Sequence, residues 1–152
     1  MSIREKLQSM GLELPVAPLP VAAYVPAVRT GNLVFTAGQL PLIDGKLGAE
    51  GKVGGAVSPE QAKEMAQVCA LNCLGAVETV ASVDDIKRIV RVVGYVNGVP
   101  GFIAAPGVVN GASELFIALF GDANGKHARS AFGVAELPLN APVEIELTVE
   151  LK

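Results

Sequence analysis

From position 143 to position 151, apolar and polar side chains alternate without exception. Successive side chains of a β-strand point to opposite faces of the sheet, so this period of two predicts a strand with one buried face. The buried face carries Val, Ile and Leu, whereas the other face includes Glu144 and Glu146. The sequence therefore predicts a sheet that is covered on one side and turns acidic side chains away from that cover.

The rest of the chain predicts an α+β arrangement around this strand. The patterns indicate an amphipathic helix at 2–12, a proline-rich connector at 15–20, a hairpin with strands at 24–28 and 33–36, a short strand near a tight turn at 44–45, a long helix from 59, a strand at 86–97, a helix at 106–120 and a strand at 129–135. This order suits a mixed or antiparallel sheet with its helices on one face. A typical domain has roughly 100–200 residues, so positions 1–152 are expected to form one domain that begins with the helix and connector of 1–20.

The long helix carries its own start signal. Ser58 is suited to the N-cap, Pro59 to the first helical position, and Gln61 is placed to complete a capping box. The apolar stripe that follows has the period of a helix and consists mostly of small side chains. We therefore expect this helix to pack closely against its neighbours.

Composition limits the class of protein. Hydrophobic residues make up 51% of the chain, charged residues make up 18%, and the mean hydropathy is +0.46. The uncharged stretch 95–113 is broken by glycines and two prolines, whereas a membrane-spanning helix needs about 20 apolar residues without such breaks. Excess apolar surface is then best hidden between subunits, which predicts an obligate oligomer with no membrane partner. The first residues lack the apolar centre of a signal peptide, so a cytoplasmic location is expected.

Charge and reactive side chains argue against several functions. The net charge is −3 and Lys and Arg form no runs, which disfavours nucleic acid as a partner. Cys69 and Cys73 lie four positions apart in a helical pattern and His127 is the single histidine, so a four-ligand zinc site is not expected and the thiols should lie in the core. The sequence has no Ser-His-Asp spacing and no phosphate-binding loop.

Arg129 is the strongest candidate for a binding residue. It opens a predicted strand in which Ala131, Gly133 and Ala135 share its side of the pleat, leaving space beside the guanidinium. A guanidinium in a small cavity can hold a planar carboxylate through two parallel hydrogen bonds, a geometry that lysine cannot reproduce. The alternative is a structural ion pair.

Several segments resemble the YjgF/Rid (reactive intermediate deaminase) family, whose older name is L-PSP endoribonuclease. They are 36–41 (TAGQLP), Asn110, 129–138 (RSAFGVAELP) and 143–146 (VEIE), and the resemblance extends from about Pro18 to Leu151. The motifs occur in the same order as in the family. The resemblance implies a chorismate-mutase-like α+β subunit, with three copies forming a barrel-like homotrimer that has ligand clefts between neighbours.

The resemblance also implies a reaction. Deaminases of this family hydrolyse enamines and imines, such as 2-aminoacrylate and its imine, to 2-keto acids and ammonia without a cofactor. Arg129 would hold the carboxylate of the small ligand, Glu144 would position or activate the attacking water, and Tyr24 and Asn110 would line the cleft. The residues leave other readings open: Glu144 could be a solvated carboxylate, Tyr24 could pack in the core, and Asn110 could cap the helix that it begins.

Two positions depart from the family pattern within the implied ligand site. Ala37, before Gly38, replaces the family's usual serine, and Ala131 replaces a cysteine. Both changes make the expected pocket more apolar. A non-catalytic carboxylate-binding trimer on the same scaffold is therefore the alternative function, and RNA cleavage ranks below both.

Overall fold

The computed structural model describes residues 1–18 and 22–152, and in this part of the chain a five-stranded sheet has the order β1-β2-β7-β5-β6. Parallel pairing joins β5 to β6, and the other neighbours are antiparallel. The central strand, β7, is the last in the sequence. The strands are β1 (Ala27–Thr30), β2 (Leu33–Thr36), β5 (Ile86–Asn97), β6 (Ala128–Val134) and β7 (Val143–Leu151), with a separate hairpin of β3 (Leu42–Ile43) and β4 (Lys46–Leu47).

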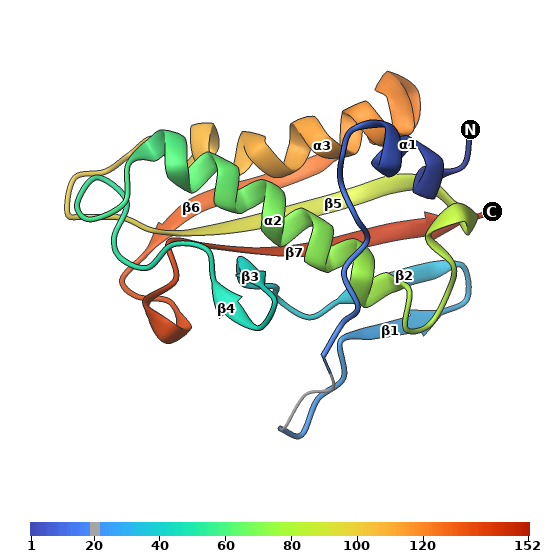
Figure 1. Cartoon of the computed structure of the whole chain (residues 1–152), viewed down its shortest axis with the longest axis horizontal. Helices are drawn as coiled ribbons and strands as arrows, with labels where there is room; N and C mark the ends of the chain where they lie inside the picture. Colours follow the sequence, from blue (N-terminus) through green and yellow to red (C-terminus); the bar gives the residue numbers. More distant parts are fainter. Residues whose placement is uncertain (19–21) are drawn as a thin grey trace.

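Two long helices cover one face of this sheet (Figure 1). The long helix α2 (Pro59–Val77) packs on β7 and β2, and α3 (Ala105–Gly125) packs on β5 and β6. A short amino-terminal helix, α1 (Ile3–Ser9), contacts α3 and the 3-10 turn η1 (Val83–Asp85). The predicted α+β architecture, a mixed sheet with its helices on one face, is therefore confirmed.

Glycines mark the points at which these layers approach most closely. A Cβ on Gly94 of β5 would clash with the side chain of Val109 in α3, and a Cβ on Gly111 of α3 would clash with the backbone carbonyl of Lys63 in α2. The layers thus meet where no side chain intervenes. This agrees with the close packing predicted for α2.

The predicted capping box of α2 is only half formed. Ser58 Oγ accepts a hydrogen bond from the backbone N–H of Gln61 at 3.1 Å, but in the described residues the Gln61 side chain does not return to Ser58. A complete box instead starts α1, where Glu5 N donates to Ser2 Oγ at 3.1 Å and Ser2 N donates to Glu5 Oε2 at 2.7 Å.

Element boundaries differ from the predictions in several places. The first strand begins at Ala27 and not at position 24. The second long helix starts at Ala105 and reaches Gly125, with a break at Gly121, whose φ of 76° turns the chain back. The connector leaves α1 and passes α2 at Gly75, where a Cβ would clash with the Pro15 carbonyl. The end of the predicted connector, positions 19 and 20, lies outside the described residues.

The alternation of β7 is confirmed, because its apolar residues are buried and its polar residues are partly exposed. The face of the sheet opposite the helices, called here the open face, also carries large apolar side chains. Phe35 is 44% exposed and Phe132 is 47% exposed.

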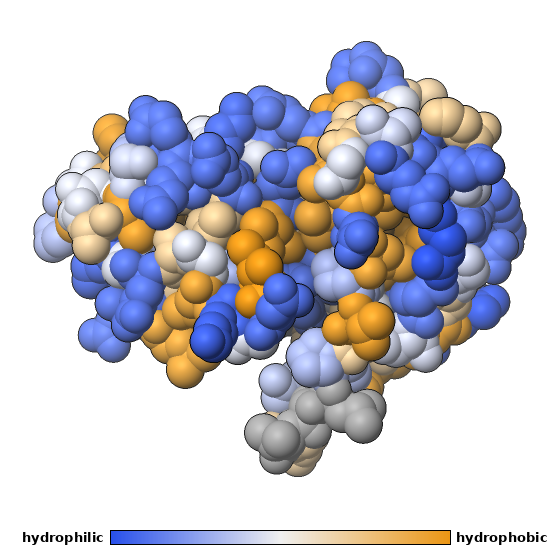
Figure 2. Space-filling view, in the orientation of Figure 1, coloured by the Kyte–Doolittle hydropathy of each residue, from blue (hydrophilic) through white to orange (hydrophobic). Residues whose placement is uncertain are grey.

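On the side of the molecule shown in Figure 2, which has the orientation of Figure 1, hydrophobic residues appear in patches between hydrophilic ones. Within the described residues, no helix is both long enough and apolar enough to cross a membrane.

Candidate functional site

Arg129 lies at the start of β6 and its guanidinium is held by α3. Nη1 donates to Asn110 Oδ1 at 2.7 Å and to Ser113 Oγ at 3.2 Å, and Nη2 lies 3.4 Å from the carbonyl oxygen of Pro106. Within residues 1–18 and 22–152, no carboxylate forms an ion pair with Arg129. The structural ion pair is therefore wrong as an account of this arginine inside one chain.

The guanidinium keeps donors for a ligand. A guanidinium has five N–H groups, and the contacts with α3 use both groups on Nη1 and one on Nη2. No described residue accepts from Nε of Arg129. Two neighbouring nitrogens thus retain a free N–H, which is the arrangement that meets both oxygens of a carboxylate.

Glu144 lies on the open face of the sheet, as its place in the alternation predicts. Its cross-strand partner is Tyr95 on β5. Its carboxylate also lies against Gly38, because a Cβ at Gly38 would come 2.7 Å from Glu144 Oε2. Burial, followed by the charge of Glu146, raises the pKa of Glu144 above its ordinary value. In the described part of the chain no group donates a hydrogen bond to this carboxylate, which leaves it free to take a proton from a bound molecule.

A second set of side chains surrounds Glu144 on the open face. The hydroxyl of Tyr95 donates to Glu146 Oε1 at 2.8 Å, and the Tyr95 ring meets Phe132 edge to face at 5.4 Å between centroids. Burial and this hydrogen bond raise the pKa of Tyr95 to about 12. Tyr95 is therefore a neutral donor that orients Glu146.

Arg129 and Glu144 lie on opposite faces of the same sheet. Arg129 is in register with Val92, which pairs with Leu147, and both of these are buried under the helices. The open face instead carries Glu144 and its partner Tyr95. Within one chain, therefore, the predicted carboxylate-binding residue Arg129 and the predicted water-activating residue Glu144 do not lie together.

The other predicted residues divide between the two faces. Ala131 is in register with Gly94 and packs against the core on the side of Arg129. The backbone N–H of Ala37 bonds the carbonyl of Pro26 at 2.8 Å, which places Ala37 and Gly38 at the end of the hairpin nearest Tyr24.

Two alternative readings of these residues are wrong. Tyr24 is 60% exposed, so it does not pack in the core. Asn110 lies inside α3, five positions after its start, and its side chain accepts from Arg129, so it does not cap that helix.

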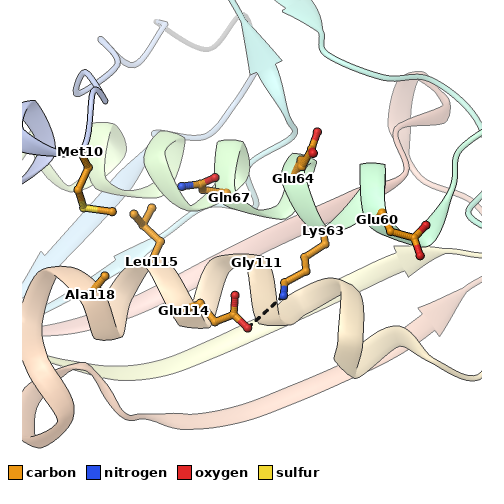
Figure 3. A pocket seen from close by; sticks show the side chains of 9 residues that line it. All are labelled: Met10, Glu60, Lys63, Glu64, Gln67, Gly111, Glu114, Leu115 and Ala118. Atoms are coloured by element: carbon orange, nitrogen blue, oxygen red, sulfur yellow. Dashed lines mark hydrogen bonds and ion pairs between the residues drawn. The ribbon is translucent and has the colours of Figure 1, made fainter.

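Two pockets lie away from Arg129. One of about 380 Å³ is a groove between α2 and α3, where Lys63 and Glu114 form an ion pair of 3.1 Å (Figure 3). The other, of about 370 Å³, lies on the open face beside Phe35, Arg91 and Glu146. Neither includes a residue that the sequence predicted for the site.

The sequence analysis missed Ser113 and His127 as neighbours of Arg129. Ser113 Oγ lies 2.9 Å from His127 Nε2, and His127 Nδ1 lies 2.6 Å from the carbonyl oxygen of Gly125. Asn110 and Ser113 are three positions apart on a helix and so share a face. That spacing would have found Ser113, but the approach of His127 depends on the turn at Gly121.

Comparisons with known proteins agree on one family. Residues 4–151 match the family described as "YjgF/chorismate_mutase-like, putative endoribonuclease". Protein TCP17 of Trypanosoma cruzi is 36% identical over 150 residues, covering 98% of this chain and 94% of that protein. The 2-iminobutanoate/2-iminopropanoate deaminase of Dermatophagoides farinae is 32% identical over 141 residues, covering 93% and 95%. A crystal structure of an Agrobacterium tumefaciens protein of unknown function has a TM-score of 0.90 at 40% identity, covering 99% of this chain and 92% of that one. The fold, the order of the motifs and these matches show that the chain belongs to the YjgF/chorismate-mutase-like family.

Proposed function

We propose that this protein hydrolyses reactive enamines and imines, such as 2-aminoacrylate and its imine tautomer, to 2-keto acids and ammonia. The observation that supports the proposal is the position of the Arg129 guanidinium. Hydrogen bonds to α3 hold it in place, and N–H groups on Nε and Nη2 remain free for a ligand. The relative from Dermatophagoides farinae that is named a 2-iminobutanoate/2-iminopropanoate deaminase supports this reaction class.

Arg129 binds the carboxylate that substrate and product share. The two free N–H groups on neighbouring nitrogens meet the two carboxylate oxygens, so the bond is charge-assisted and bidentate. Asn110 and Ser113 fix the far side of the guanidinium. This contact fixes the ligand without any cofactor.

Glu144 acts on water. Its raised pKa makes it a better proton acceptor than an ordinary surface carboxylate. Glu144 takes a proton from water as the oxygen bonds to C2 of the imine, and it returns this proton to the imine nitrogen, which gives a carbinolamine. The hydroxyl proton of the carbinolamine then passes to the departing amine as the C–N bond breaks, which releases ammonia and leaves the keto group, so water is the only co-reactant.

A second copy of the chain completes the site. Since Arg129 and Glu144 lie on opposite faces of one sheet, a ligand that touches both needs Arg129 from one protomer and Glu144 from its neighbour. The apolar side chains on the open face, including Phe35 and Phe132, support packing of that face against other copies. The homotrimer that the family resemblance implies has such clefts between neighbours.

The test measures 2-keto acid formation from 2-aminoacrylate generated in solution. Wild type is expected to accelerate its loss over buffer. Arg129→Ala lowers ligand affinity by about 30-fold or more, because truncating one partner of a buried charge pair costs about 2 kcal/mol or more. Glu144→Gln keeps the shape of the side chain and lowers turnover about 100-fold with binding retained. A wild-type rate equal to that of buffer contradicts the reaction.

Mixing the two variants tests the shared site. Protomers with Arg129→Ala and protomers with Glu144→Gln, unfolded and refolded together in equal amounts, form some interfaces that pair an intact Arg129 with an intact Glu144. Random assembly of a ring gives about a quarter of the wild-type sites. Each variant refolded alone is the control. Activity in the mixture no higher than in the controls contradicts the shared site.

A carboxylate-binding protein without turnover is the second candidate. Ala37 and Ala131 stand where the family usually has serine and cysteine, so the site offers fewer polar groups to a reacting molecule. In that case Arg129→Ala loses binding of pyruvate, and wild type binds pyruvate without accelerating imine loss.

RNA cleavage fits the site less well, in spite of the family's endoribonuclease name. The chain has a net charge of −3 and a single histidine, so it lacks both a basic excess and a pair of histidines for acid-base cleavage.

The proposal keeps the cytoplasmic location that the sequence suggests, since pyridoxal-phosphate enzymes release such imines inside cells.

A further inference from the structure

Two side chains that take no part in the proposed chemical step lie directly behind Arg129. Ser113 is only 8% exposed, and its hydroxyl oxygen lies 3.2 Å from Arg129 Nη1 and 2.9 Å from His127 Nε2. The other ring nitrogen of His127 lies 2.6 Å from the carbonyl oxygen of Gly125. These contacts form a continuous series of hydrogen bonds from the backbone of α3 to the guanidinium.

The chemistry of each atom sets the direction of every hydrogen bond in this series. A carbonyl oxygen only accepts, so Nδ1 of His127 carries a proton and donates to Gly125. In the neutral ring Nε2 then accepts, so the Ser113 hydroxyl must donate to it. The lone pairs of the Ser113 oxygen are left for Arg129, whose N–H groups can only donate. Neutral His127 thus orients the Ser113 oxygen towards the guanidinium.

The surroundings of His127 keep it neutral and in place. Burial lowers its pKa and the charge of Arg129 lowers it further, while the Gly125 carbonyl partly offsets both. The ring meets Phe116 edge to face, with 6.1 Å between centroids. Arg129 on β6 is the cation that acts on it, and α3 turns the uncharged Ser113 and Phe116 towards it.

Other charges nearby are paired or lie on the opposite side of the sheet. Lys126, the residue before His127, is exposed and bonds Asp122 at 2.8 Å. Arg91 on β5 bonds Ser130, which shares the open face and not the face of His127. Protonation of His127 would therefore act mainly on its neighbours Ser113 and Arg129.

We propose that His127 and Ser113 are positioning residues that fix the guanidinium of Arg129, so that its Nε and Nη2 groups face the ligand carboxylate. The inference rests on the proposed function for the identity of the ligand. Ser113 and Asn110 occupy both N–H groups of Nη1, which prevents the guanidinium from rotating towards α3. A guanidinium fixed before binding loses less entropy when a carboxylate arrives.

The test compares three variants with wild type, using pyruvate as the probe in calorimetric titrations. His127→Leu removes the acceptor for Ser113, and Ser113→Ala removes the hydroxyl itself, so each is expected to weaken pyruvate binding about fivefold to tenfold. His127→Gln offers Oε1 as an acceptor that does not titrate, and it is expected to bind within about twofold of wild type. Equal affinity of His127→Leu and wild type overturns the inference.

The dependence of pyruvate affinity on pH distinguishes a positioning role of His127 from a role in which its protonated ring only adds positive charge. Below the lowered pKa of His127, the protonated ring donates from Nε2 and competes with Arg129 for the Ser113 oxygen. Wild-type affinity for pyruvate is then expected to fall about fivefold as the pH drops from 7 through the lowered pKa of His127, with a smaller change for His127→Gln. An affinity that rises as pH falls means that the imidazolium acts only as an added positive charge, and it overturns the inference.

A measurement without ligand keeps this test independent of the proposed function. Nitrogen-15 NMR of the Arg129 guanidinium is expected to show slow rotation about the Cζ–Nη1 bond in wild type and in His127→Gln, and faster rotation in His127→Leu. The same rotation in all three overturns the positioning role, whatever the ligand. If rotation changes as expected but neither wild type nor Arg129→Ala binds pyruvate, the proposed function fails and the positioning role stands.

Discussion

Replacing Gly111 by alanine tests how closely α2 and α3 pack. A Cβ at this position would lie 2.9 Å from the carbonyl carbon of Lys63 and 3.2 Å from Cβ of Ala66, whereas carbon atoms are best separated by about 3.5–4.0 Å. The atom nearest to the new methyl group is the backbone oxygen of Lys63, which cannot rotate away as a side chain can. The two helices must therefore move apart.

The expected change in the free energy of unfolding follows from two opposing effects. Overpacking of a well-packed interface costs about 1–3 kcal/mol, and alanine gains up to about 1 kcal/mol over glycine inside a helix. We expect Gly111→Ala to lower the free energy of unfolding by about 1–2 kcal/mol. Gly107→Ala on the same helix is the matched control. Nothing lies within 4 Å of its ideal Cβ, so it is expected to raise the free energy of unfolding by about 0.5 kcal/mol.

Thermal and urea unfolding at one fixed protein concentration measure this difference, because the stability of the proposed oligomer would depend on concentration. For a chain of this size, 1 kcal/mol corresponds to about 3 °C in Tm. The two variants should therefore differ by about 5–8 °C, with Gly107→Ala the more stable. A Tm of Gly111→Ala equal to or above that of Gly107→Ala would show that the helices are not packed backbone to backbone.

Two further predictions concern Gly38 and the cysteines. Gly38→Ala places a Cβ 2.7 Å from Glu144 Oε2, so it should displace that carboxylate and lower the rate of 2-keto acid formation about tenfold or more, while pyruvate binding is retained; an unchanged rate would contradict the placement of Glu144. Cys69 and Cys73 are fully buried, and burial raises the pKa of both thiols. They should react with a thiol reagent only as fast as the protein unfolds, and rapid labelling of the native protein would contradict this.

Strongly periodic segments were predicted well from the sequence. The alternation of β7 and the helical stripe of α2 each give one consistent face over many residues, so the fold class and the direction of Glu144 followed directly. The predicted start of β1 was wrong by three residues, since the apolar side chains at 24–26 match a strand pattern but pairing with β2 begins only at Ala27.

Relations across the sheet were not accessible from the sequence. That Arg129 and Glu144 point to opposite faces depends on the parallel register of β6 with β5, which no local pattern reveals. The contact of His127 with Ser113 depends on the positive φ of Gly121, where the chain turns back along α3. Local periodicity specifies a residue's side of its own element, but not which residues of another element it meets.

The position of β7 has a consequence for the order of folding. This strand is the last in the sequence, yet it separates β2 from β5 in the middle of the sheet. Until it is synthesised, the amino-terminal hairpin and the β5-α3-β6 unit have no common strand to pair with. Contacts so distant along the chain slow folding, and a nascent chain that stops before Val143 would expose the edges of two incomplete sheets. We expect such intermediates to be the stage at which this protein is most prone to aggregate.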